Sequence, residues 1–145
     1  MKKQILMSML VVAALTILST AVQAQSQLYW SGNVPFEFNA GGKTLAAGEY
    51  NVRIVNPTSD RHALLIQNVE TRESVIVQTM NDRNEITNFA TLQFRRYGNH
   101  YFFGGVQLAG DSLTLRVMKS KSERTIWSEF TKHGDSGTMV AIKTK

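Results

Sequence analysis

The densest group of side chains that could bind a ligand lies in the segment FRRYGNHYFF, residues 94–103. A cation, a phenol hydroxyl and an aromatic face can together hold an anionic or sugar-like ligand. Strand alternation would place Arg95 and Tyr97 on one face, with Tyr101 nearby on the partner strand. A cross-strand pair that only stabilises a sheet is the simpler interpretation of the same residues. The candidate ligand-binding residues are Arg95, Arg96, Tyr97, His100 and Tyr101.

Catalytic and metal-binding patterns are weak. Residues 134–137 spell Gly-Asp-Ser-Gly, which surrounds the nucleophile of chymotrypsin-like proteases, and His62 and His133 precede them. A catalytic triad is defined by geometry, however, and a turn explains the same four residues. The three histidines, which include His100, lack metal-ligand spacing. We therefore predict no catalytic residue, metal site or cofactor, and favour a protein that is not an enzyme over a small hydrolase.

The first 24 residues have the pattern of a secretory signal peptide. Two lysines precede an apolar run at residues 5–18, and small residues end at Ala24. The run is shorter than the ~20 residues that span a bilayer, which favours a cleaved signal over a membrane anchor. We predict cleavage after Ala24, export to the periplasm or the extracellular space, and no transmembrane segment after cleavage.

Residues 25–145 are predicted to form a single β-rich domain, which must fold without disulfides because the chain has no cysteine. Val34, Phe36 and Phe38 alternate as in a strand, and Gly41-Gly42 fits a hairpin turn. Gly98-Asn99 predicts another tight turn, and Gly104-Gly105 predicts a bulge. Further strands are predicted near residues 25–32, 50–54, 62–69, 75–80, 90–95, 101–108, 113–118 and 139–143.

One helix is predicted near the C-terminus. Ser120 and Glu123 fit a capping box, and Ile126, Trp127 and Phe130 follow at helical spacing. A helix over residues 121–131 is therefore expected, with Trp127 in the core, although a strand over this stretch stays open. The predicted fold class is mainly β: one antiparallel β-barrel or β-sandwich of about seven to eight strands with this short helix. The barrel is the favoured version.

Four motifs cover most of the chain after residue 24: VPFEF, GGKTLAAGEYNV, FRRYGNHYFF and LRVMKSKSERTIW. In this order they resemble a family of small uncharacterised exported proteins of environmental bacteria. The resemblance implies a secreted, mostly β domain without known catalytic residues. Ala46 stands where the family's turn often carries proline, which should loosen the turn slightly.

The formal net charge is +5, and the basic excess lies in residues 113–145. Such a face can meet anionic lipid headgroups or acidic glycans, or be solvated without a partner. Nucleic acid is not expected, because no binding motif is present. Three functions follow, in order of preference: a non-enzymatic domain that binds an anionic or glycan-like ligand or an envelope component, an interaction protein acting through an exposed sheet edge, and a small hydrolase.

Overall fold

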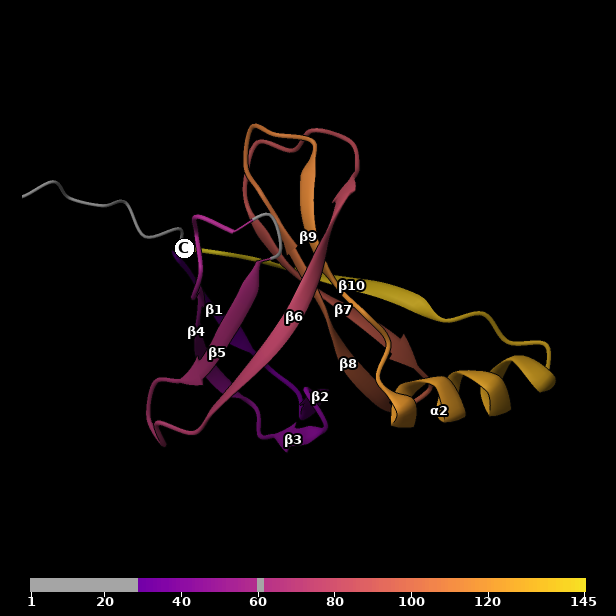
Figure 1. Ribbon diagram of the computed structural model, residues 1–145. Helices are drawn as coiled ribbons and strands as arrows, with labels where there is room; N and C mark the ends of the chain where they lie inside the picture. The colour runs from indigo at the N-terminus through magenta and orange to yellow at the C-terminus, as the bar shows by residue number, and fades with distance from the viewer. Residues whose placement is uncertain (1–28, 60–61) are drawn as a thin grey trace, which may run out of the picture.

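The computed structural model describes residues 29–59 and 62–145, so the predicted signal peptide, residues 1–24, lies outside the described residues. The described chain is mainly β, with ten strands and one short helix (Figure 1). The elements are β1 (Tyr29–Val34), β2 (Phe38–Ala40), β3 (Lys43–Leu45), β4 (Gly48–Ile54), β5 (Ala63–Asn68), β6 (Ser74–Arg83), β7 (Thr91–Tyr97), β8 (His100–Gln107), β9 (Leu113–Val117), α2 (Lys121–Lys132) and β10 (Thr138–Lys143). In this part of the chain, no helix combines the length and the apolar character needed to cross a membrane.

The strands form one mixed sheet rather than the purely antiparallel arrangement expected. Its order is β1-β4-β5-β6-β9-β8-β2-β3, and β7 pairs with both β8 and β10. All strand pairs are antiparallel except β2 with β8, which run parallel where Asn39 faces Phe102. The sheet is not closed, because no ladder joins β10 to β1 among the described strands. The expected count of seven to eight strands was too low, since β2 and β3 are only three residues each.

The strand predicted from Val34 to Phe38 is instead a corner between β1 and β2. Pro35 follows the last residue of β1, where a missing N–H costs no ladder hydrogen bond. The hairpin turn was predicted correctly: Gly41 and Gly42 have φ angles of 56° and 81° and join β2 to β3. Glycine adopts these left-handed angles without the steric penalty of a Cβ.

β6 is longer than predicted and belongs to both halves of the sheet. Its first half pairs with β5 and its second half, from Thr79 to Arg83, pairs with β9. The polar residues 81–83 suggested an exposed loop, because Asn and Asp are disfavoured in strands. Pairing with β9 overrides that local preference, as it does in many sheets where neighbouring strands decide the outcome.

The interior is filled by side chains that alternate along the strands. Phe94 contacts Phe36, Phe38 and Phe103 edge-on, with ring centroids 5.2 to 5.6 Å apart. The largest apolar side chains that are fully buried are Tyr50, Phe38, Phe94, Phe103, Leu45, Leu64, Ile66, Leu92, Leu115, Val34 and Val52. A ligand is therefore more easily placed outside the sheet than in its interior.

The predicted glycine bulge lies in β8. Gln93 faces Gly105 and Phe94 faces Phe103, so Gly104 has no partner across the ladder. Gly105 has a φ of 141°, and a Cβ there would lie 2.1 Å from the carbonyl oxygen of Leu115 on β9. The close approach of β8 to β9 therefore requires glycine at position 105.

Gly105→Ala should destabilise the fold by more than ~3 kcal/mol, or prevent folding, because a backbone clash adds to the strain of a positive φ. Gly110→Ala is the matched control, since Gly110 also has a positive φ (69°) but its Cβ would meet no atom within 4 Å. Urea unfolding should show a loss of only ~1–3 kcal/mol for the control. Equal losses for the two variants would contradict the close approach.

Candidate functional site

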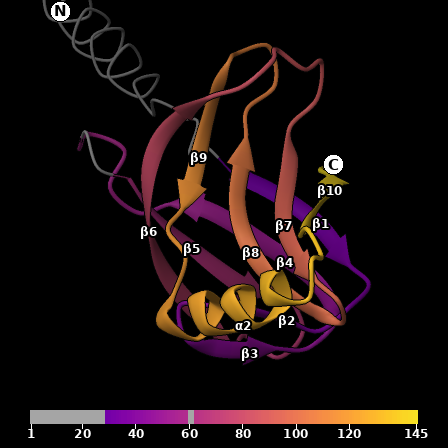
Figure 2. The same ribbon diagram turned by 90° about the vertical axis from the view of Figure 1, so that its right-hand side faces the viewer.

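Helix α2 lies across the outer face of the sheet, at the ends of β7 and β8 that are far from the β8–β9 turn (Figure 2). The helix was predicted correctly, with Ser120 as N-cap: its hydroxyl accepts a hydrogen bond of 3.1 Å from the backbone N–H of Glu123. Glu123 is the one buried residue of the helix. The helix is thus attached to the sheet largely through a single acidic side chain and its neighbours.

The Glu123 carboxylate forms an ion pair with Arg95 of β7. Arg95 donates from Nε to Oε1 at 2.5 Å and from Nη2 to Oε2 at 2.8 Å. Both side chains are shielded, with 11 % of Arg95 and 2 % of Glu123 exposed. The Arg95 Nη1 also donates to the backbone carbonyl of Val117 at 3.0 Å, which ties β7, β9 and α2 together. A bidentate pair of this kind fixes orientation as well as distance.

Tyr97 completes this buried network. Its hydroxyl donates to Oε1 of Glu123 at 3.1 Å, and its ring lies near Phe102 and Phe130, with centroids 5.9 and 6.1 Å away. Burial raises the pKa of Tyr97 to about 12, and the negative charge of Glu123 adds to the effect. The Tyr97 hydroxyl therefore acts as a neutral donor that holds Glu123 rather than as an acid or base.

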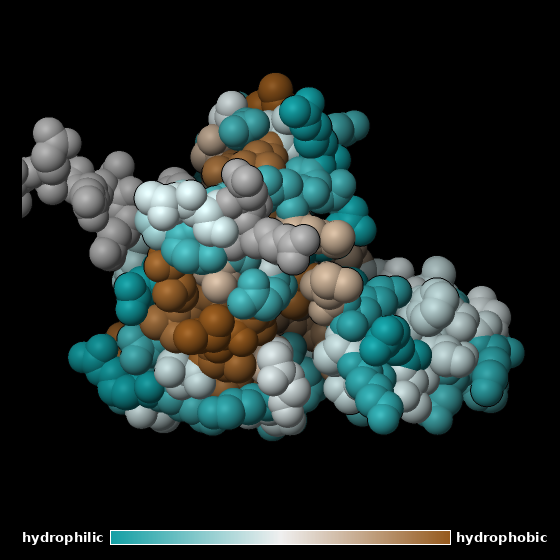
Figure 3. Space-filling model, viewed as in Figure 1, coloured by the Kyte–Doolittle hydropathy of each residue, from teal (hydrophilic) through white to brown (hydrophobic). Residues whose placement is uncertain are grey.

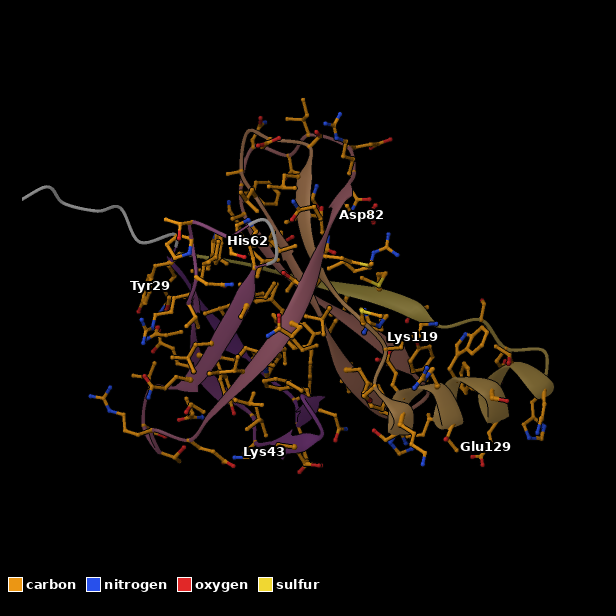
Figure 4. The ribbon with its side chains drawn as sticks, in the orientation of Figure 1. Tyr29, Lys43, His62, Asp82, Lys119 and Glu129 are labelled. Carbon is orange, nitrogen blue, oxygen red and sulfur yellow. The ribbon has the colours of Figure 1, made fainter. Side chains whose placement is uncertain are left out.

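A groove of about 500 Å³ opens beside this network, on the outer face of β6, β7, β8, β9 and β10. A smaller hollow of about 190 Å³ continues from it towards α2 and shares Arg95, Lys119 and Met139. Lys119 lies between the sheet and the helix (Figure 4). The apolar side chains that line the two hollows include Met80, Met118, Val117, Met139 and Trp127.

Most charges in the groove are already paired. Arg95 is bound to Glu123, and Arg116 forms an ion pair with Asp82. Lys119 makes no ion pair with a described residue; its ammonium lies 4.2 Å from the ring centroid of Trp127 and 5.9 Å from that of Tyr97. Lys119 is therefore the cation of the groove that remains available to an anionic group.

The structure separates the five predicted candidates into two faces. Arg95 and Tyr97 share a face, as predicted, and both line the smaller hollow, while Arg95 also lines the groove. Tyr101 does not join them, because it faces Arg96 across the β7–β8 ladder. The ring of Tyr101 stacks on that of Phe36, with the ring centroids 3.9 Å apart. Phe36 belongs to the inner side of the sheet.

The other two candidates lie outside the groove. The guanidinium carbon of Arg96 lies 5.5 Å from the ring centroid of Tyr101, and its Nε donates to the Gly98 carbonyl at 2.8 Å. His100 is exposed beside the turn, as expected for a structural position. Arg96 and Tyr101 thus form a cross-strand pair, the simpler interpretation of the motif.

Sequence reasoning missed the other residues of the groove. Trp127 was expected in the core but is 42 % exposed and borders the smaller hollow. Glu123 was recognised only as a capping residue, although its side chain turns to the sheet. The only signal in the sequence that could have identified Lys119 and the methionines was the occurrence of large apolar residues next to a cation.

Two further findings bear on chemistry. His62, the residue before β5, lies far from the turn at residues 134–137 that follows α2, so these parts of the protease-like pattern are not assembled (Figure 4). Among the described residues, no group of three or more His, Asp or Glu side chains is placed to hold a metal ion.

No protein-family model, curated protein or solved structure matches the chain. The geometry of the groove is therefore the basis for a functional proposal.

Glu123→Ala should lower the free energy of unfolding by ~3–5 kcal/mol, because it leaves the buried Arg95 charge and the Tyr97 hydroxyl without their partner. Asp82→Ala is the matched control: its pair with Arg116 is exposed, and its loss should cost at most ~1 kcal/mol. Urea unfolding of both variants measures the difference. Similar losses would show that the buried pair does not attach the helix.

Tyr97 should make stability fall at alkaline pH. Its pKa of about 12 lies above the ordinary value of 10.0, so the folded state keeps a proton that the unfolded state loses. Its contribution is complete below pH 10 and declines by up to ~3 kcal/mol as pH rises to 12. The stability advantage of wild type over Tyr97→Phe should therefore shrink across this range in urea unfolding. A constant difference would contradict the raised pKa.

Proposed function

We propose that the protein is an exported, non-enzymatic binding protein that holds a small ligand in the groove on the outer face of its sheet. One observation carries the proposal: Lys119 has no ion-pair partner among the described residues, and apolar side chains such as Met118, Met139 and Trp127 line the hollows beside it. This combination suits a ligand with one anionic group and an apolar or ring-shaped body. An anionic lipid fragment or an acidic glycan of the cell envelope has this chemistry.

The packed interior supports a site outside the sheet. Side chains such as Phe94, Phe103 and Leu115 occupy the space where a ligand of an open barrel would lie. The paired arginines support the same view, since Arg95 and Arg116 already have carboxylate partners. Lys119 then supplies the charge, and Trp127 supplies a ring face for stacking.

We also infer a barrel-like arrangement in place of a sandwich. The Lys145 backbone N–H donates to the Ser31 carbonyl at 2.9 Å, and the Lys145 ammonium pairs with Glu49 at 2.7 Å. Gly32 of β1 approaches Ile142 of β10 closely enough that a Cβ would lie 3.7 Å from its methyl group. These contacts bring the two ends of the sheet near each other. Export itself rests on the signal-peptide pattern of residues 1–24.

An interaction protein is the second candidate. β3 pairs only with β2 among the described strands, which leaves one edge of β3 for another chain. Apolar surface also gathers over β5 (Figure 3), where exposed Ile76 of β6 faces Leu65. Concentration-dependent self-association in native mass spectrometry would support this candidate.

The ligand proposal is tested by the fluorescence of Trp127, with decanoate, decanol and maltose as probes. Decanoate should bind to wild type, and Lys119→Ala should weaken binding about tenfold or more, because a charge-assisted contact is worth ~1.5–3 kcal/mol. Lys119→Arg should keep most of the affinity. Lys43→Ala, on the exposed hairpin strand β3, is the control and should bind as wild type does.

Equal binding of decanol and decanoate would show that Lys119 does not select an anion. If none of the probes bound, and native mass spectrometry of protein from its own envelope fraction found no retained small molecule, the proposal would be wrong. Trp30 is 7 % exposed and reports from the core, so Trp127→Phe identifies the signal that belongs to the groove.

A further inference from the structure

We propose that the outer face of α2 docks the protein onto a membrane surface that contains anionic phospholipid. Three cations share this face: Lys121, and Arg124 and Lys132, which follow it by about one and about three helical turns. None of the three lines the groove or the smaller hollow. The inference therefore concerns a second surface and does not depend on the ligand proposed for the groove.

This face is exposed and directed away from the sheet. α2 projects from the side of the sheet (Figure 1), and the labelled side chain of Glu129 points away from the strands (Figure 4). A shallow hollow of about 390 Å³ runs along the face and is lined by exposed side chains: Lys121, Arg124, Thr125, Ser128, Glu129 and Lys132. From the first to the last of them the helix rises ~16 Å, so a flat surface can meet all of them without a change of the fold.

The positive charges of this face are not neutralised by the fold. Within the described part of the chain, none of the three cations forms an ion pair. Glu123 is close to them in sequence, but its carboxylate is turned to the sheet and bound by Arg95. Glu129 is the one acid that lines the hollow, so three cations stand against a single carboxylate. The face therefore attracts a negatively charged partner.

The placement of two of these cations is unfavourable for the helix itself. α2 begins at Lys121, and Arg124 follows within about one turn. The N-terminal end of a helix carries partial positive charge, which favours acidic side chains there and disfavours Lys and Arg. Like charges on neighbouring positions of one helix face also repel each other. Two cations that lower helix stability without forming an ion pair are explained by a partner outside the chain.

An anionic bilayer suits this face better than an acidic glycan does. Phosphate oxygens of lipid headgroups accept hydrogen bonds from Lys and, in a forked geometry, from Arg. Ser128 lies between Arg124 and Lys132 on the same face and adds a hydroxyl donor. Headgroups in one plane can contact all three cations at once, and each basic residue near such a surface adds to the attraction. No aromatic residue among the described ones lines the hollow, so a sugar would find no ring face on which to stack.

The test is co-sedimentation with lipid vesicles, using protein purified from its own envelope fraction. Wild type should bind vesicles of equal parts phosphatidylglycerol and phosphatidylcholine, and it should not bind vesicles of phosphatidylcholine alone. Binding should weaken tenfold or more as salt shortens the Debye length from ~10 Å at 0.1 M to ~3 Å at 1 M. Binding to phosphatidylcholine alone, or binding that salt leaves unchanged, would overturn the proposal.

The triple variant Lys121→Gln, Arg124→Gln, Lys132→Gln should bind the anionic vesicles at least tenfold more weakly. Glutamine is a good helix former, so thermal unfolding should stay close to that of wild type. Glu129→Gln should instead bind more tightly, because it removes the one carboxylate of the hollow. An unchanged affinity in the triple variant would show that α2 does not meet the membrane.

The matched control is the triple variant Lys43→Gln, Arg53→Gln, Arg83→Gln, which removes the same formal charge from exposed positions on β3, β4 and β6. It should bind vesicles as wild type does, and an equal loss in both triple variants would reduce the effect to net charge and overturn the proposal. Tighter binding of polygalacturonate than of vesicles would assign the face to an acidic glycan and overturn it as well. The α2 triple variant should still bind decanoate, which separates this surface from the groove.

Discussion

The ion pair between Arg95 and Glu123 is the interaction on which the outer layer of the protein depends. No other residue of α2 is buried, and the described chain contains no cysteine that could attach the helix covalently. Removing both charges from water is costly, and the bidentate geometry with the added hydroxyl of Tyr97 offsets that cost. The helix position, and with it one wall of the smaller hollow, follows from this network.

The glycine bulge of β8 makes room for that network. A Cβ at Gly104 would lie 3.4 Å from the guanidinium of Arg95 and 3.2 Å from the carbonyl of Gln93. The absence of a side chain lets Arg95 cross β8 and reach the Val117 carbonyl on β9. A local irregularity of one strand therefore decides where a charged side chain on its neighbour can go.

Local chemistry in the sequence predicted the local structure well. The turn glycines, the bulge and the N-cap of α2 each depend on residues close together in the chain. Pairing between distant strands was not predictable in this way, so the long β6 and the short β2 and β3 were missed. Of the five predicted site residues, only Arg95 and Tyr97 line the hollows. The two-residue turn at Gly98-Asn99 pairs Arg96 with Tyr101, and this register already separates Tyr101 from Arg95 and Tyr97.

The buried network also determines which side chains of the groove are left for the proposed ligand. A cation that holds the fold together is not free to bind a ligand. Arg95 of the FRRYGNHYFF segment therefore has a structural role. The residues left for the proposed recognition lie outside the core and the ion pairs: Lys119, whose ammonium lies over the Trp127 ring, Trp127 itself and the exposed methionines. The proposed binding residues are thus better found by asking which side chains lie outside the core and the ion pairs than by asking which could do chemistry. That criterion moves the proposed site from the aromatic hairpin to the groove and to the smaller hollow beside α2.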